Sequence, residues 1–288
     1  MLFGQRKCNS YGHVSMKEED KMTRLLVFVS FALLLVWQGN GFCASNLVAA
    51  WSFDEGAGDT VKDVSGNGHN GTISGAKWID GKLGKALDFN GDGDQVLVPH
   101  DNTLNIKGEL TVEAWVFPKG WNPDLNAVAQ KWEDGTNRRQ YQLDVYTERN
   151  WWYVSDAGSN WPRAEGKIAV ALNQWTHLAG TYDGKTLRSY TNGKFDVELA
   201  QANGIFASDI PLVIGGYGPK TPKCTYAQNR HFKGIIDEVR IWNKVLTEDE
   251  IKAEMGKSIA PVQPLGKCAT EWGQIKSNFY LIFLMVLA

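Results

Sequence analysis

The chain has 288 residues, with 30 Lys and Arg against 32 Asp and Glu and a formal net charge of -2. This balance argues against nucleic acid or an anionic membrane as a partner held by bulk charge, and the length fits one large all-β domain or two small domains. The 30 glycines and 12 tryptophans are typical of a β protein with many tight turns and with flat aromatic side chains available to a ligand.

Residues 22–45 are predicted to be a secretory signal peptide. An apolar run, residues 24–37, follows Lys21 and Arg24 and ends at small residues, which is the pattern of such a leader. The run is shorter than the about 20 residues that a membrane span needs, so no firm span is expected after cleavage. We therefore expect a protein that is secreted, on the cell surface or in the periplasm.

The two ends of the chain leave several points open. Residues 1–21 are polar and precede Met22, so they are either an untranslated stretch or a polar leader. Residues 256–288 form a tail without an assigned role, and its apolar end is only half a membrane span long. Export would permit a disulfide bond between Cys224 and Cys268, but their spacing alone does not decide whether they pair.

Strands separated by glycine-rich turns are predicted from residue 47 onward. Residues 47–53 place Leu, Ala, Trp and Phe on one face, whereas residues 63–72 contain too many glycines for regular structure and predict a shaped loop. A strand is expected within 78–89, and the Asp-Gly turn in 90–94 predicts a hairpin with a strand at 95–99.

The middle of the chain continues the same pattern. Residues 110–118 alternate between apolar and polar side chains, and short strands are expected at 127–132 and 140–145. Residues 175–194 contain an Asp-Gly and an Asn-Gly turn, which predict a meander of three strands, and one more strand is expected at 211–216.

The last strand is predicted at 234–242, where residue types alternate strictly with a period of two. Ile236, Glu238, Arg240 and Trp242 should then share one face. Thr247 and Glu250 lie three residues apart and form the pattern of a capping box, which predicts a short amphipathic helix after this strand.

Four motifs along the chain resemble those of laminin-G-like jelly-roll domains in the concanavalin A-like lectin/glucanase superfamily. They are Trp-Ser-Phe-Asp-Glu-Gly with Asp-x-Ser-Gly-Asn-Gly, Thr-Val-Glu-Ala-Trp-Val, Trp-x-His-x-Ala-x-Thr-Tyr-Asp-Gly, and Gly-Ile-Ile-Asp-Glu-Val-Arg-Ile-Trp-Asn. The resemblance covers residues 46–255. It implies an all-β fold, a two-sheet antiparallel jelly-roll sandwich with a short C-terminal helix, in which the first and last strands can pair.

Tryptophans crowd between residues 119 and 163, and this crowding predicts a ligand-binding surface. Aromatic faces cover the apolar patches of sugars, while amides, carboxylates and cationic side chains hold the hydroxyl groups. Because adjacent strand residues face opposite ways, at least one of Trp151 and Trp152 should be exposed. The candidate ligand-binding residues are Trp121, Lys131, Trp132, Arg138, Tyr141, Trp151, Trp152, Trp161 and Arg163, with Arg139 and Asp144 of matching composition.

A calcium ion is the cofactor that the sequence suggests. Asp54 and Asp237 lie where a lone buried carboxylate would be costly, and Asn67 and Asn70 lie in a bent loop that offers oxygen donors. The family resemblance adds weight, since many such domains hold a structural calcium near the matching loop. The alternative is that Asp54 caps a turn and that Asp237 accepts main-chain hydrogen bonds.

Catalysis has little support in the sequence. Glucanases of the resembled superfamily carry paired acidic residues on one strand, and that spacing does not occur on the predicted strands here. We therefore expect a non-catalytic module that binds a polysaccharide or the glycan of a glycoprotein. The alternative is a protein-interaction or adhesion module with an extracellular protein as its partner, and a glycoside hydrolase or lyase relative is the least supported reading.

Overall fold

The computed structural model describes residues 46–133, 138–156, 160–217 and 230–259. The strands of the first sheet, sheet A, are β1 (Leu47–Trp51), β4 (Lys77–Asp80), β5 (Lys85–Asn90), β7 (Leu110–Pro118), β12 (Thr176–Tyr182), β13 (Thr186–Thr191), β14 (Lys194–Ala200) and β16 (Lys233–Trp242). Those of sheet B are β2 (Thr60–Val61), β3 (Gly71–Ser74), β6 (Gln95–Val98), β8 (Asn126–Glu133), β9 (Arg138–Tyr146), β10 (Arg149–Val154), β11 (Arg163–Ala169) and β15 (Leu212–Ile214).

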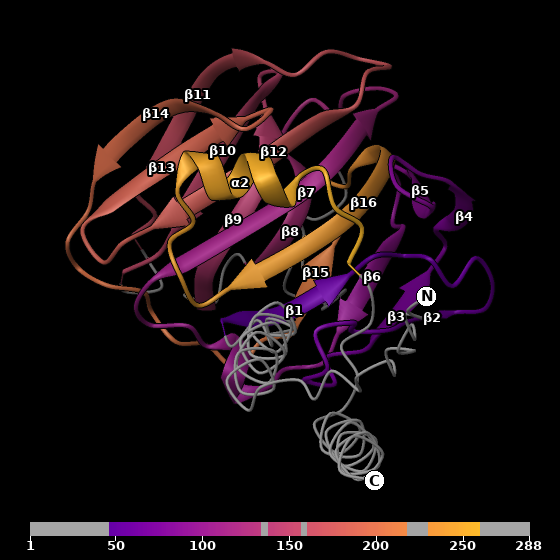
Figure 1. The fold of residues 1–288 in the computed structure, drawn as a ribbon, viewed down its shortest axis with the longest axis horizontal. Coiled ribbons are helices and arrows are strands. Elements are labelled where there is room, and N and C mark those ends of the chain that lie inside the picture. The colour runs from indigo at the N-terminus through magenta and orange to yellow at the C-terminus, as the bar shows by residue number, and fades with distance from the viewer. Residues whose placement is uncertain (1–45, 134–137, 157–159, 218–229, 260–288) are drawn as a thin grey trace, which may run out of the picture. The chain divides into compact units, whose positions relative to one another are not determined.

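Both sheets are antiparallel, and each contains eight strands within the described residues (Figure 1). Sheet A runs in the order β14-β13-β12-β7-β16-β5-β4, with β1 also paired to β16, and sheet B runs in the order β11-β10-β9-β8-β15-β6-β3-β2. A 3₁₀ turn, η1 (Asn102–Leu104), and a helix, α2 (Glu248–Glu254), complete the described elements. The predicted all-β sandwich with a short C-terminal helix is confirmed.

The core lies between the two sheets and is filled by alternate residues of both. Trp51 and Leu178 of sheet A and Leu143 and Trp152 of sheet B have no exposed surface. The indole of Trp152 lies against Gly180, where a Cβ would come within 2.2 Å of the ring. Glycine is therefore required at this point for the two sheets to approach each other.

Strand β16 is the central strand of sheet A. One of its edges pairs with β7 and the other with β5 and then β1, so the predicted pairing of the first and last strands is confirmed. A register shift between Asp237 and Arg240, with Glu238 at a φ of 51°, interrupts the strand. The predicted strict alternation is therefore wrong, because this bulge turns Ile236 and Val239 to the same inner face.

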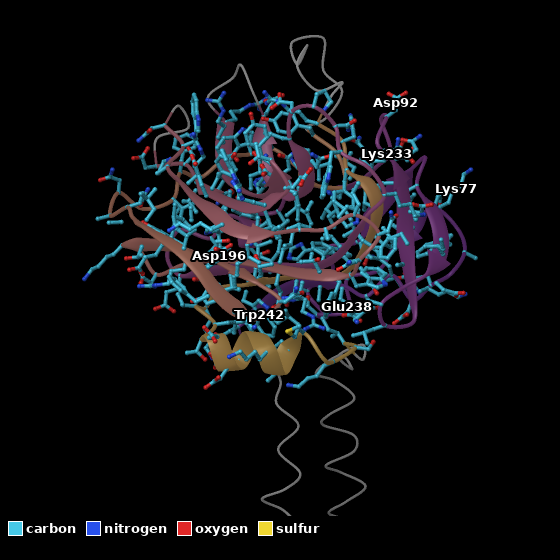
Figure 2. All side chains as sticks on the ribbon, turned by 90° about the horizontal axis from the view of Figure 1, so that it is seen from above. Lys77, Asp92, Asp196, Lys233, Glu238 and Trp242 are labelled. Atoms are coloured by element: carbon cyan, nitrogen blue, oxygen red, sulfur yellow. The ribbon has the colours of Figure 1, made fainter. Side chains whose placement is uncertain are left out.

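Helix α2 covers the outer face of sheet A, the face turned away from the core (Figure 1). Thr247 and Glu250 form the predicted capping box at its start. The indole Nε1 of Trp115 donates a 2.9 Å hydrogen bond to the carbonyl of Met255, which ties the end of the helix to β7. In Figure 2, Glu238 and Trp242 lie on the side of the sheet that α2 covers.

A charged cluster is sealed under this helix. Arg240 is 1% exposed, and its guanidinium pairs with Glu238 at 3.0 Å and with Glu113 at 3.6 Å. Trp242 Nε1 donates to Glu113 Oε1 at 3.1 Å, and His177 Nε2 lies 3.5 Å from Glu113 Oε2. Burial raises the pKa of Glu113 to about 7 and lowers the pKa of His177 to about 3. These groups hold the helix on the sheet.

The hairpin predicted across residues 90–94 is wrong. Strand β5 lies in sheet A with both edges occupied, by β4 and β16, whereas β6 lies in sheet B between β3 and β15. Residues 90–94 do form a tight turn, since Gly91 and Gly93 have positive φ and Asp94 accepts a hydrogen bond from the Asn90 amide. This turn connects a strand of sheet A to a strand of sheet B. The strand predicted within 78–89 is also two strands, β4 and β5, and β10 and β11 were not predicted.

Several predictions lie outside the described residues. They concern the leader, the tail beyond residue 259, and the pairing of Cys224 with Cys268. Within the described part of the chain, no helix is long and apolar enough to cross a membrane.

Candidate functional site

The outer face of sheet B carries a hollow of about 180 Å³. Four neighbouring strands, β8 to β11, supply most of its lining. The rest comes from the residue before β8, the connection between β10 and β11, and the segments that follow β15 and precede β16. We call it the arginine–aromatic hollow. Its lining residues are Leu125, Trp132, Arg139, Gln142, Tyr153, Trp161, Arg163, Tyr217 and Arg230.

The alternation of strand side chains decides which residues face this hollow. On β10, Trp152 belongs to the core between the sheets, whereas Trp151 and Tyr153 belong to a separate apolar cluster on the outer face. On β9, Leu143 points into the core, and its neighbour Gln142 lines the hollow.

A bulge brings the floor of the hollow together. Trp132 on β8 is paired with Arg139 on β9, and a register shift lies between Lys131 and Trp132. The guanidinium carbon of Arg139 lies 5.5 Å from the centroid of the Trp132 ring and 4.2 Å from that of Trp161. Both distances are within the range of a cation–π contact, so one cation organises two indoles.

The other two arginines stack on aromatic rings in the same way. Arg163 lies 5.0 Å from the Trp151 ring, and Arg230 lies 4.7 Å from the Tyr217 ring. Each also has an acidic partner, since Arg163 Nε donates to Glu165 at 2.8 Å and Arg230 Nε donates to Asp124 at 2.7 Å. The guanidinium groups of Arg163 and Arg230 are thus each held by an aromatic ring and by a carboxylate.

A buried carboxyl group lies beside Gln142 on β9. Gln142 Nε2 donates a 2.6 Å hydrogen bond to Asp144 Oδ2, and Asp144 Oδ1 has no hydrogen-bond partner within the described residues. Burial raises the pKa of Asp144 well above its usual range, although Arg230 and Arg163 oppose that rise. Burial likewise raises the pKa of the Tyr153 hydroxyl, with the charge of Asp144 adding to the effect. Burial therefore disfavours the charged form of both groups.

The structure brings four of the predicted ligand-binding residues to this face. Trp132, Trp161 and Arg163 line the hollow, and Trp151 lies under Arg163. Trp161 is 41% exposed, which leaves its indole accessible at the rim.

Five predicted residues do not reach the hollow. Trp152 and Tyr141 point into the core, where Trp152 Nε1 donates to the Thr181 carbonyl and the Tyr141 hydroxyl to the Leu104 carbonyl. Lys131 is buried and its Nζ donates to two main-chain carbonyls, and burial lowers its pKa to about 8. The remaining two are Trp121, which packs against the core, and Arg138, which pairs with Glu133 and Asp209.

Sequence reasoning missed four lining residues besides Leu125. Gln142 and Tyr153 could have been found, because each is the outward neighbour of a core residue on a strand. Tyr217 and Arg230 could not, because they come from the segments on either side of residues 218–229 and carry no strand pattern of their own.

The side chains of the predicted calcium ligands form hydrogen bonds with main-chain groups of the protein. Asp54 Oδ1 accepts from the Lys85 amide, and Asp237 Oδ2 accepts from the amides of Lys82 and Leu83 in the turn between β4 and β5. Asn67 donates its amide hydrogens to two carbonyls of β1, and Asn70 Oδ1 accepts from the amide of Asp63.

The contacts of Asp54 and Asp237 match the alternative stated for these two residues, which is hydrogen bonding to the main chain. Asp63, which was not predicted, organises the loop by accepting from the amides of Ala50, Ser65 and His69. Across the described residues, no group of three or more His, Cys, Asp and Glu side chains could hold a metal ion. The calcium ion at Asp54, Asn67, Asn70 and Asp237 stays a prediction.

Comparison with known proteins supports the fold. A family model described as "Concanavalin A-like lectin/glucanases superfamily" matches residues 90–252. Pappalysin-1 of Mus musculus is 25% identical over 196 residues, which are 59% of this chain and 11% of that protein. The chain thus spans about a tenth of the length of this relative.

Two solved structures resemble the fold. One is domain 4 of AbnA, a GH43 extracellular arabinanase from Geobacillus stearothermophilus in complex with arabinotriose, with a TM-score of 0.56, 23% identity, and coverage of 72% of this chain and 97% of that chain. The other is the binding domain of Paraclostridial Mosquitocidal Protein 1, with a TM-score of 0.59, 17% identity, and coverage of 74% and 52%.

Proposed function

This chain belongs to the concanavalin A-like lectin/glucanases superfamily, and from that membership we propose that it is a non-catalytic module that binds a glycan in the arginine–aromatic hollow. The observation that carries the proposal is the contact of Arg139 with both Trp132 and Trp161, on a sheet face that the described helix α2 does not cover. Aromatic walls with a few polar groups between them are what a saccharide needs, because its CH patches pack on rings while its hydroxyls make hydrogen bonds.

A structural relative supports the same class of ligand. Domain 4 of AbnA, which shares this fold, was solved with arabinotriose. The likeness extends to the fold alone, so the sugar and its position on this chain rest on the hollow itself.

The absence of catalysis is part of the proposal. Glycosidases that retain configuration use two carboxyl groups about 5 to 5.5 Å apart, one as acid and one as nucleophile. The described residues that line the hollow include no carboxyl group. Asp144 beside it is buried and held by Gln142, so it lacks the exposure that a nucleophile requires.

We also propose that the protein is exported. The basis is the signal-peptide pattern of residues 22–45, and an external glycan is the partner that export would make available. Mass spectrometry of the mature N-terminus checks this point, and a protein that keeps residues 22–45 would contradict it.

A glycan array tests the binding function. We expect the wild type to bind at least one polysaccharide, and Trp161→Ala to weaken that binding by about tenfold or more, because it removes an exposed ring from the hollow. Phe195→Ala is the matched control, since Phe195 is 44% exposed on β14 of the other sheet. A wild type that binds no glycan, or a Trp161→Ala variant that binds like the wild type, would contradict the proposal.

A protein-interaction module is the second candidate. Exposed apolar side chains favour it, because Phe195 and Leu199 on β14 and Ile168 on the neighbouring β11 are all exposed. Under this alternative an extracellular protein would bind at that edge, and Phe195→Ala would be the variant that loses its partner.

A further inference from the structure

We infer that the arginine–aromatic hollow selects an acidic saccharide, one that carries carboxylate or sulfate groups, over a neutral one. This inference rests on the proposed glycan-binding function and names the class of glycan. Its support comes from the charges, the hydrogen-bond donors and the surroundings of the hollow, each of which is a separate observation.

The charges that line the hollow are of one sign. Among its described lining residues, every charged side chain is an arginine, and the three arginines come from three separate parts of the chain. Arg139 lies on β9, Arg163 begins β11, and Arg230 precedes β16. The whole chain has a net charge of -2, so this concentration of positive charge is local rather than a reflection of the composition.

The arginines are arranged to meet a flat anionic group. Arg163 and Arg230 each stack on a ring, and Arg139 lies close to two rings. The N–H donors of a guanidinium lie in its plane, so a stacked guanidinium presents donors along its edge. Carboxylate and sulfate oxygens accept such donors in pairs, which gives an arginine a geometric preference for these groups.

The balance of donors and acceptors points in the same direction. A sugar hydroxyl both donates and accepts, and a wall that binds neutral sugars must offer acceptors as well as donors. Here the polar lining apart from the arginines is Gln142 and two tyrosines, and the Tyr217 hydroxyl already accepts from Arg230 at 2.8 Å. A ligand group that only accepts hydrogen bonds, such as a carboxylate or a sulfate, therefore complements this lining better than a hydroxyl does.

The nearby acids do not cancel this preference. Asp144 is bonded to Gln142 and is not among the residues that line the hollow, and burial raises its pKa and so disfavours its charged form. Glu165 and Asp124 pair with two of the arginines, and their side chains are about half exposed. The Arg163–Glu165 pair is exposed on both sides and is therefore weak, so an anionic ligand can take the place of Glu165.

Two matched pairs of polymers test the inference by isothermal titration. Polygalacturonate is compared with methyl-esterified polygalacturonate, and dextran sulfate is compared with dextran. We expect at least one acidic member to bind about tenfold tighter than its neutral counterpart, and the pair that shows the difference tells carboxylate from sulfate.

An arginine variant tests whether the hollow is the source of the preference. Arg163→Gln should reduce the ratio of acidic to neutral affinity by about fivefold, while the matched Arg188→Gln should leave it unchanged. Arg188 is a suitable control because it also forms partly exposed ion pairs, with Asp183 and Glu198, but lies on β13 of sheet A. Melting temperatures of both variants show whether they fold.

The outcomes separate the inference from the proposed function. Equal affinity for both members of each pair, tighter binding of the neutral members, or no binding of either acidic polymer overturns the inference while a positive glycan array keeps the function. An Arg163→Gln variant that weakens acidic and neutral binding equally also overturns it. A blank array overturns both.

Discussion

The two outer faces of the sandwich carry the same ingredients and differ in what covers them. On sheet A, Arg240, Glu113 and Trp242 are sealed under α2 and the residues after it. On sheet B, Arg163 stacks on Trp151 with a side chain that is 37% exposed, and the described helix does not lie over it. Both faces combine arginines with tryptophans, so their residue types do not distinguish them. The difference is that a helix buries the cluster on sheet A, which makes that cluster structural, whereas the arginine on sheet B stays accessible to a ligand.

On sheet A, burial under α2 holds the charged side chains around Arg240 in one arrangement. Arg240 donates to the carbonyls of Glu254 and Lys257 as well as to Glu238, so one cation joins the sheet to the end of the helix. On sheet B, Arg163 pairs with Glu165, and bulk water screens this pair because both side chains are exposed. The first set should therefore govern stability and the second should govern affinity.

Removing the buried cation should have the largest effect. We expect Arg240→Met to lower the free energy of unfolding by about 3–5 kcal/mol, because it leaves Glu113 and Glu238 buried without their partner. Denaturant unfolding measures the loss. The control is Arg188→Met, whose partly exposed pairs with Asp183 and Glu198 should be worth about 1 kcal/mol or less each. Equal losses in both variants would break the comparison.

Trp151 and Trp152 are adjacent on β10, so substituting each in turn compares the outer face of sheet B with the core on a single strand. Trp152→Ala should cost about 3–5 kcal/mol of unfolding free energy, because the core between the sheets loses a fully buried indole. Trp151→Ala should cost about 1 kcal/mol and should weaken glycan binding instead, because it removes the ring under Arg163. Thermal melts and titrations of both variants decide; the reverse pattern would contradict the assignment of faces.

The acid under the helix should make stability depend on pH. Burial raises the folded-state pKa of Glu113 from 4.5 to about 7, so the folded protein holds a proton that the unfolded chain releases. The stability that this proton contributes is fully present below about pH 4.5 and is lost as the pH rises through about 7. Relative to Glu113→Gln, the wild type should lose on the order of 1–3 kcal/mol over this range.

This difference between wild type and variant isolates Glu113. The pKa of Asp237 is also raised to about 7 by burial, but that group is present in both proteins and its effect cancels. Unfolding free energies measured from pH 4 to pH 8 that run parallel for the two proteins would contradict the assignment.

Calcium should have the smallest effect. We expect the melting temperature to be the same within about 1 °C in EDTA and in millimolar calcium, because a ligand stabilises a protein only when it binds the folded state. The side chains of Asp54 and Asp237 are already used by main-chain amides. A fall of several degrees in EDTA would show that calcium binds after all.

The sequence predicts the strands well because their signals are local. Alternation predicts β7, the Asp-Gly and Asn-Gly turns of residues 175–194 predict β12 and its neighbours, and Thr247 and Glu250 predict the start of α2. Local signals do not say which sheet a strand joins, and for this reason the Asp-Gly turn near Asp92 predicts a hairpin although it connects two sheets.

The candidate site was predictable only in part. The crowding of tryptophans indicated β8 to β11, but alternation assigns Trp151 and Trp152 to opposite faces without saying which one is the inner face. That choice depends on the partner sheet, where Gly180 leaves room for the Trp152 ring. Tyr217 and Arg230 join the hollow through tertiary structure alone.

Indole NMR of the protein with ¹⁵N-labelled tryptophan tests the central claim most directly. During titration with the acidic polymer fragment that binds most tightly, the Nε1–H signals of Trp132, Trp151 and Trp161 should shift. Those of Trp115, Trp152 and Trp242, which donate to partners inside the protein, should stay in place. Shifts confined to Trp115 and Trp242 would place the ligand on the other face and contradict this account.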